Sequence, residues 1–342
     1  MKKLLTIIIP SYNMEAYLPQ CIDSLIVPGF EKVEVLIIND GSKDNTSDIA
    51  HDYERRYPLS VRCIDKTNGN YGSCINRGLQ EMTGKYVKIL DADDSFDSDN
   101  FKIFIEKIEN LDVDVIVTNF QTINSEGKFV TELKYSLPSH RQFPVDILLP
   151  ELTKTGLHMH TLAYRSSIFH EFNYRQTEGI SYTDTEWNFI PMHKVNVAAF
   201  VPVSLYKYLV GRIGQSIDTN TTIKNISQLI KVTQRITEFN ISVYDSLPAA
   251  VRDYYHNYIY SMILMVYKIG VLGGYGKCDV QMQDFDKWVR NVISTDNILK
   301  LERESARFLP GLKFHFLKWY HKSPAHPLLR LRHSVKKMIL RK

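Results

Sequence analysis

Short β-branched runs alternate with helical patterns over the first 95 residues, and this alternation limits the possible folds more than any other property of the sequence. The apolar runs have the composition of strands that are buried on both faces of a sheet. Between them, at 18–26 and 75–82, apolar residues recur at the three- and four-residue spacing of a helix face. The pattern predicts an α/β fold with a mostly parallel central sheet flanked by helices. The runs are 4–9, 33–38, 61–64 and 86–90.

Each of the four runs ends in a polar cluster. The carboxyl ends of parallel strands share one edge of an open α/β sheet, and ligands bind in the crevice there. Polar turns are common in ordinary loops, but four at one edge favour a binding site. The clusters are Ser11-Tyr12-Asn13, Asn39-Asp40-Gly41-Ser42, Asp65-Lys66-Thr67-Asn68-Gly69 and Asp91-Ala92-Asp93-Asp94.

The pattern changes further along the chain. A helix is expected at 98–111, followed by strands at 114–120 and 128–133. After Asp218 the pattern is helical, at 222–240, 249–272 and 280–293. We therefore expect a sheet-containing domain at 1–218, a mainly α-helical domain at 219–310 and a basic amphipathic segment at 311–342.

Charge is distributed unevenly along the chain. The formal net charge is +4, but residues 311–342 alone hold nine Lys or Arg and no Asp or Glu. Leu328, Leu331, Val335, Met338 and Ile339 lie there at helical spacing, which suits the surface of an anionic membrane. Packing of this helix back onto the protein is the alternative. We expect no transmembrane span, and nothing before residue 311 supports nucleic-acid binding.

The acidic stretch "KYVKILDADDSFDSDN" at 85–100 places five aspartates after an apolar run. Asp91, Asp93 and Asp94 follow the expected strand directly, and carboxylate oxygens at this spacing suit Mg²⁺ or Mn²⁺. A solvated acidic loop is the simpler interpretation. A DxD phosphatase of the haloacid dehalogenase type is a further alternative, although three βα units precede the motif here.

Four segments together resemble the motifs of family 2 glycosyltransferases with the GT-A fold. They are "TIIIPSYNMEAYLPQCIDSL", "VEVLIINDGSKDNTSDIA", "TNGNYGSCINRGLQEMTGKYVKILDADD" and "ISYTDTEWNF", and the resemblance covers residues 3–217. It implies a nucleotide-sugar-binding and catalytic domain at 1–218. It also implies that Asp40 accepts a hydrogen bond from the uracil imide, although capping of the next helix is its structural alternative. The other residues that the resemblance assigns to the nucleotide are Pro10, Ser11, Tyr12, Asn13, Asn68, Gly69, Asn76 and Asp91.

The resemblance also implies a metal and a catalytic base. Asp93, together with Asp91, is expected to hold Mn²⁺ or Mg²⁺, with Asp94 as a supporting residue. Asp184 matches the base that takes the proton of the attacking hydroxyl, and Glu186 is its rival because Thr183 replaces the acid that usually precedes the base.

The segment "YKYLVGRIGQSID" resembles the one that closes the donor site in capsule and exopolysaccharide members of the family. Arg212 and Gln215 are therefore expected to reach the diphosphate, with an ordinary exposed turn as the alternative. His158 and His160 are expected on the acceptor side.

These features favour an inverting, metal-dependent transferase, hexosyl or N-acetylhexosaminyl, that uses a UDP-sugar. The resemblance implies a glycan or polyprenyl-linked acceptor in bacterial surface polysaccharide synthesis. We expect a cytoplasmic protein attached peripherally to the inner leaflet, and a homodimer is compatible with the sequence. The competing class is a non-catalytic nucleotide-sugar-binding or scaffold protein on the same fold.

Overall fold

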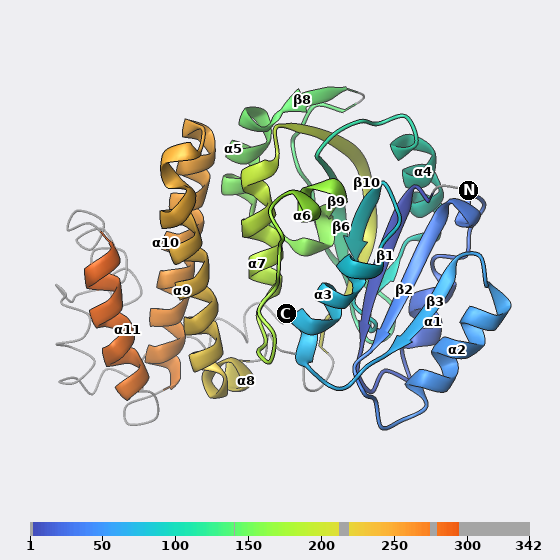
Figure 1. Ribbon diagram of the computed structural model, residues 1–342, viewed down its shortest axis with the longest axis horizontal. Coiled ribbons are helices and arrows are strands. Elements are labelled where there is room, and N and C mark those ends of the chain that lie inside the picture. The colour runs from blue at the N-terminus through green and yellow to red at the C-terminus, as the bar shows by residue number, and fades with distance from the viewer. Residues whose placement is uncertain (1–2, 140, 212–218, 274–278, 294–342) are drawn as a thin grey trace. The chain divides into compact units, whose positions relative to one another are not determined.

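The computed structural model describes residues 3–139, 141–211, 219–273 and 279–293 (Figure 1). The chain divides into two compact units, and each is described by itself. The first comprises residues 1–213 with 242–255, and the second comprises residues 214–241 with 256–342.

One ten-stranded sheet forms the centre of the first unit, with the order β3-β2-β1-β4-β9-β6-β10-β5 and with β7 and β8 paired to β6 and β10. Of the eight strands along this path, only β9 and β5 run against the others. The mostly parallel sheet expected from the sequence is therefore confirmed. The strands are β1 Leu5–Ser11, β2 Val33–Asn39, β3 Val61–Asp65, β4 Tyr86–Ile89, β5 Ser95–Phe96, β6 Val115–Ile123, β7 Phe129–Leu133, β8 Gln142–Pro144, β9 Leu162–Arg165 and β10 Val197–Leu209.

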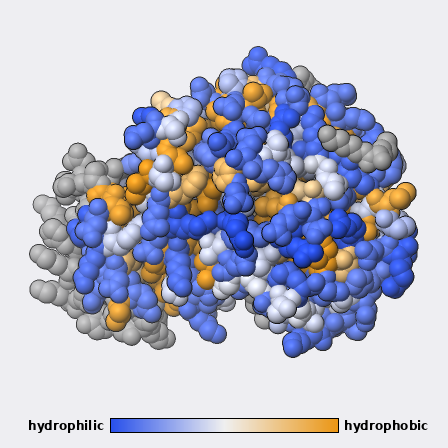
Figure 2. Space-filling view, in the orientation of Figure 1, coloured by the Kyte–Doolittle hydropathy of each residue, from blue (hydrophilic) through white to orange (hydrophobic). Residues whose placement is uncertain are grey.

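Helices flank this sheet (Figure 1). Nearly every residue of β1, β2 and β4 is buried, as expected for strands covered on both faces, whereas β3 at the edge of the sheet is partly exposed. Hydrophilic residues cover most of the face of the molecule shown in Figure 2. The helices of this unit are α1 Leu18–Asp23, α2 Thr46–Arg56, α3 Asn70–Glu81, α4 Ser98–Ile108, α5 Val145–Thr155, α6 Ser167–Glu171 and α7 Asp184–Phe189, with short 3-10 turns at Phe30–Lys32, Met159–Thr161, Ile190–Lys194 and Tyr244–Ser246.

Part of the core lies directly beneath the acidic segment. The ring of Phe96 in β5 packs 5.2 Å from Phe101 of α4 and 5.7 Å from Tyr206 of β10. The acidic turn is therefore followed directly by two elements, β5 and α4, that pack against each other. Strand β10, more than a hundred residues later in the chain, packs against β5 as well. The burial of large aromatic rings is the main stabilising contribution there.

Strand β10 is the largest element that the sequence did not predict. It contains Pro202, and its pairing with β6 shifts register twice, between Val201 and Ser204 and between Ser204 and Tyr206. These irregularities break the strict alternation by which half-buried strands are recognised.

The described residues after 218 are mainly helical, as expected, and form α8 Thr219–Lys224, α9 Ile226–Val243, α10 Ala249–Gly273 and α11 Asp279–Val292. In the second unit, Asp286 of α11 accepts hydrogen bonds from Tyr267 of α10 and Arg290, at 2.7 and 2.8 Å. No helix within the described ranges has the length and apolar character that crossing a bilayer requires. The basic segment 311–342 lies outside the described residues.

Candidate active site

The turns that follow β1 and β2 are hydrogen-bonded to each other. The amide of Asn13 donates to Ser42 Oγ at 3.0 Å, and Asn13 Oδ1 accepts from the amide of Lys43 at 2.8 Å. Ser11 is buried and its carbonyl accepts from the amide of Asp40, whereas the side chain of Tyr12 is 44% exposed. Pro10 to Asn13 thus form a fixed turn at the carboxyl edge, beside the Asp40 turn.

Asp40 is buried and its carboxylate has three donors. Lys66 Nζ lies 2.6 Å from Oδ1, the amide of Gly69 donates to Oδ1 at 2.9 Å and the amide of Asn70 donates to Oδ2 at 2.9 Å. Because Asn70 begins α3, Asp40 caps this helix. The alternative taken from the sequence was capping of the next helix along the chain, α2, whose N-cap is Asn45. A carboxylate has about four acceptor directions, so about one remains on Oδ2 for a ligand.

Helix α3 connects this turn to the segment before α7. Asn76 binds both the amide and the carbonyl of Gln176, at 2.8 and 2.9 Å, and donates to Glu178 Oε1 at 2.8 Å. A Cβ atom on Gly72 would lie 2.0 Å from the carbonyl oxygen of Thr177, so only glycine allows this approach. Asn76, expected at the nucleotide, therefore positions 176–178.

The acidic turn after β4 is partly buried. Asp94 is 3% exposed, and it accepts hydrogen bonds from the hydroxyl of Tyr206 at 2.6 Å and from the amide of Leu209 at 2.7 Å. Burial, followed by the neighbouring carboxylates of Asp91 and Asp93, raises the pKa of Asp94 well above its usual range. Carboxylates crowded in this way are stabilised either by protons or by a cation.

The structure adds a histidine to this turn. His160, Asp91 and Asp94 each offer one ligand atom, and these atoms lie within 4.8 Å of one another. Burial holds the pKa of His160 well below its usual range, and the neighbouring His158 and Lys88 act in the same direction. The imidazole is therefore neutral and able to bind a metal. Among the described residues, the buried Nδ1 of His160 has no hydrogen-bond partner. This donor set fits a divalent cation with oxygen and nitrogen ligands.

Asp93, expected to be the main metal ligand, faces a neighbouring cavity of ≈ 470 Å³. Tyr17, Gln20, Asn124 and Gly211 also line this cavity. Arg212 and Gln215, expected to close the donor site, lie outside the described residues.

Asp184 is the first residue of α7 and is partly buried. Burial raises its pKa, and the Glu186 carboxylate acts in the same direction, whereas the amide of Thr185 lowers it. After burial, the carboxylates of Asp91 and Asp184 both raise the pKa of Tyr71, whose hydroxyl donates to Asp91 Oδ1 at 2.9 Å. Asp184 thus belongs to the same electrostatic site as the acidic turn.

Glu186, the rival of Asp184, is fully buried. Its Oε2 accepts from the amide of Thr177 at 2.9 Å, so this carboxylate fixes the backbone of the segment 176–178. The two acids of α7 therefore occupy different environments.

Known proteins resemble this chain in sequence and in fold. Residues 6–172 match the family described as Glycosyl transferase family 2. The chain is 28% identical over 215 residues to the uncharacterized glycosyltransferase EpsJ of Bacillus subtilis (strain 168), and the match spans 60% of each chain. The chain thus spans less than two thirds of this relative.

Two solved structures share the fold. One is TarS 1–349 of S. aureus in complex with UDP-GlcNAc, with a TM-score of 0.52 and 19% identity over 89% of this chain and 92% of that one. The other is the mannosyltransferase PcManGT of Pyrobaculum calidifontis in complex with GDP-Man and Mn²⁺, with a TM-score of 0.54 and 14% identity over 98% of this chain and 88% of that one.

Proposed function

Because this chain belongs to glycosyl transferase family 2 through residues 6–172, we propose that it transfers a sugar, with inversion, from a UDP-sugar to a hydroxyl of an acceptor. The fold is the GT-A fold that the sequence resemblance implied. The proposal is supported by the hydrogen bond from Tyr71 to Asp91 Oδ1 at 2.9 Å, together with the effect of the Asp184 carboxylate on the pKa of the same hydroxyl. The proposed metal ligand and the proposed base thus both act on one side chain.

The nucleotide occupies the carboxyl edge of β1 and β2 in this proposal. Pro10 to Asn13 form one wall, and Asn68 and Gly69 close the other side of the Asp40 turn. The remaining acceptor direction on Asp40 Oδ2 suits the imide N–H of uracil, because a carboxylate accepts but does not donate. The choice of UDP is supported by the UDP-GlcNAc that TarS binds.

Asp91, Asp94 and His160 would hold the divalent cation, and Asp93 would face the donor sugar from the adjoining cavity. A bound Mn²⁺ or Mg²⁺ supplies positive charge beside the diphosphate of the leaving UDP. The Mn²⁺ bound by PcManGT supports a metal here. Lys88 Nζ donates to the carbonyl of His160 at 2.7 Å and so fixes the backbone of this ligand.

Asp184 is the base in this proposal. The acceptor hydroxyl gives its proton to the Asp184 carboxylate as its oxygen bonds to the anomeric carbon, and the bond from that carbon to the UDP oxygen breaks on the opposite face. A pKa raised by burial brings this carboxylate closer to the working pH of a general base. Glu186 would act through position only, by holding Thr177 and thereby the segment that leads to α7.

The acceptor is a glycan or a polyprenyl-linked sugar in this proposal, as in the polysaccharide transferases that the sequence resembles. Residues 1–218 carry catalysis in this proposal, and 311–342 attach the protein to the inner leaflet of the cell membrane. The helices expected as a separate domain at 219–310 are divided between the two units, because 242–255 belongs to the first. Deletion of 311–342 is expected to release the protein from anionic vesicles, and unchanged co-sedimentation would contradict the attachment.

A screen of UDP-sugars tests the enzymatic proposal. We expect the purified full chain to release UDP from one donor far faster than from the others, in the presence of Mn²⁺ but not of a chelator. Binding of UDP-sugars without any turnover, with acceptors supplied, would instead favour the non-catalytic binding protein.

A further inference from the structure

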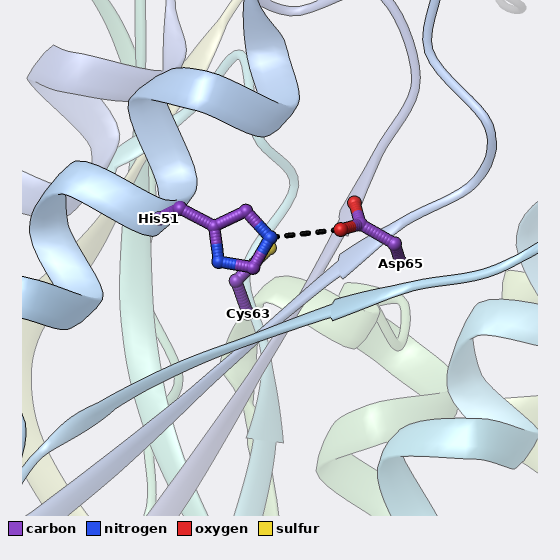
Figure 3. Close-up of side chains that lie close together, drawn as sticks. All are labelled: His51, Cys63 and Asp65. Carbon is purple, nitrogen blue, oxygen red and sulfur yellow. Dashed lines mark hydrogen bonds and ion pairs between the residues drawn. The ribbon is translucent and has the colours of Figure 1, made fainter.

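A second group of side chains with the chemistry of metal ligands lies at the β3 edge of the sheet, where α2 covers this strand (Figure 3). His51 belongs to α2, and Cys63 and Asp65 belong to β3. One ligand atom from each lies within 4.8 Å of the other two. Cys63 and Asp65 are two positions apart in a strand and therefore point to the same face, toward α2.

We propose that His51, Cys63 and Asp65 bind a zinc-class transition-metal ion, separate from the cation of the acidic turn. A thiolate, an imidazole and a carboxylate are the ligands that Zn²⁺ takes, whereas Mg²⁺ and Mn²⁺ favour oxygen. Three protein ligands leave the fourth position of a tetrahedral site to water. The side chains of His51 and Asp65 are 37% and 49% exposed, so solvent and ions reach the site.

Outer partners already orient two of the proposed ligands. His51 Nδ1 lies 2.9 Å from Glu54 Oε2, which directs Nε2 toward Asp65 (Figure 3). Asp65 Oδ1 accepts from Asn39 Nδ2 at 2.6 Å and from Ser47 Oγ at 2.8 Å, which leaves Oδ2 for the metal. A carboxylate behind a histidine, and donors behind a carboxylate, are the usual surroundings of metal ligands in proteins.

The observed spacing is close to that of a bound ion. His51 Nε2 and Asp65 Oδ2 are 2.8 Å apart, and two such ligands of a tetrahedral zinc lie about 3.3 Å apart, so the pair has to open by about 0.5 Å. An ordinary ion-pair network of His51 with Asp65 and Glu54 is the simpler interpretation. It assigns no role to the third ligand type, the Cys63 thiol, which is not in a disulfide within the described residues.

A metal at this site would hold α2 against β3. It would also fix Asp65, which binds Asn39, the residue before Asp40. We therefore expect a metal at this site to stabilise the fold and to support the turn that carries Asp40, without taking part in the transfer reaction.

Cobalt substitution tests the proposal without measuring turnover. The metal-free full chain is titrated with Co²⁺, and a thiolate-to-cobalt charge-transfer band in the near ultraviolet is expected at one equivalent and is removed by Zn²⁺. The ligands proposed at the acidic turn offer oxygen and nitrogen only and give no such band, and the nearby Cys21 thiol is tested by its own variant below. The outcome is thus independent of the proposed transferase activity.

Single substitutions assign the band. Cys63→Ser is expected to abolish it, His51→Gln to weaken Co²⁺ binding at least about a hundredfold, and Glu54→Gln about tenfold. Cys21→Ala is the matched control, because the Cys21 thiol lies beside Asp91 and is the rival source of a thiolate signal. Absence of the band, its survival in a folded Cys63→Ser protein, or unchanged Co²⁺ affinity of a folded His51→Gln protein would overturn the proposal. Loss of the band in Cys21→Ala would do the same.

Discussion

Tyr71 donates its hydroxyl to Asp91 Oδ1 at 2.9 Å, from the first turn of α3 to the turn after β4. The same hydroxyl lies 3.4 Å from the sulfur of Met159. One side chain on α3 thus links the acidic turn to the segment that carries His160, and α3 is also the helix that Asp40 caps.

Tyr71→Phe removes this hydrogen bond and leaves the ring in place. Hydrogen bonds to charged groups contribute about 1.5–3 kcal/mol, so we expect catalytic efficiency at limiting Mn²⁺ to fall about tenfold or more. Steady-state rates over a Mn²⁺ titration measure this. Tyr53→Phe is the control, because Tyr53 makes a similar bond to Asp23 at 2.7 Å but lies away from the acidic turn; an equal loss in both variants would contradict the account.

Lys66→Met is expected to weaken both stability and nucleotide binding. Lys66 Nζ pairs with the buried Asp40 at 2.6 Å and also donates to Ser73 Oγ at 2.8 Å. Removing one partner of a largely buried pair leaves the other charge uncompensated, at a cost of about 2–3 kcal/mol in the free energy of unfolding. Denaturant unfolding and UDP calorimetry measure the two effects, with the exposed Lys43→Met as control. Unchanged UDP affinity would contradict a role of Asp40 in nucleotide binding.

Gly72→Ala is expected to impair turnover more than UDP binding. The added Cβ would meet the carbonyl oxygen of Thr177 at 2.0 Å, so the segment before α7 has to move, and Asp184 with it. Misplacement of a catalytic group by about 1 Å lowers the rate by about a hundredfold. Gln80→Ala, on the exposed face of the same helix, serves as control, and normal kcat in Gly72→Ala would exclude this coupling.

Metal removal is expected to change how stability depends on pH. The folded-state pKa of Asp94 is raised, so its favourable contribution is complete below the ordinary pKa of aspartate and is lost as pH rises through the raised value. In a chelator, the melting temperature should therefore decline as pH rises above the ordinary pKa of aspartate, and Mn²⁺ should reduce this decline. Asp94→Asn should show neither effect; a flat profile of the wild-type protein in chelator would argue against a cation at this turn.

The strand ends and their polar turns could be predicted from the sequence, whereas contacts between residues far apart in the chain could not. The strand ends that carry Asp40 and Asp91 were found because a turn at the end of a short apolar run is visible within a few residues. His160 was expected on the acceptor side, and its position beside Asp91 was not predicted. This position depends on β9, which inserts antiparallel between β4 and β6. Tyr206 was missed as a partner of Asp94 because it comes from β10, whose pattern is broken by a proline and two register shifts.

The different environments of neighbouring acidic residues also could not be predicted from the sequence. The family resemblance paired Asp91 with Asp93 at the metal. In the structure Asp94 lies beside Asp91 and His160, and Asp93 lines the neighbouring cavity. For the acids of α7, burial distinguishes Glu186 from Asp184. Orientation and burial depend on the packing of distant segments, which local patterns do not encode.

The base assignment is tested most directly by transfer rates of Asp184→Asn and Glu186→Gln, measured with the donor that the UDP-sugar screen identifies. The account predicts that Asp184→Asn lowers transfer at least about a thousandfold while UDP binds with unchanged affinity, because only the proton acceptor is lost. Glu186→Gln is expected to retain measurable turnover with reduced stability. Near wild-type transfer by Asp184→Asn would contradict the account.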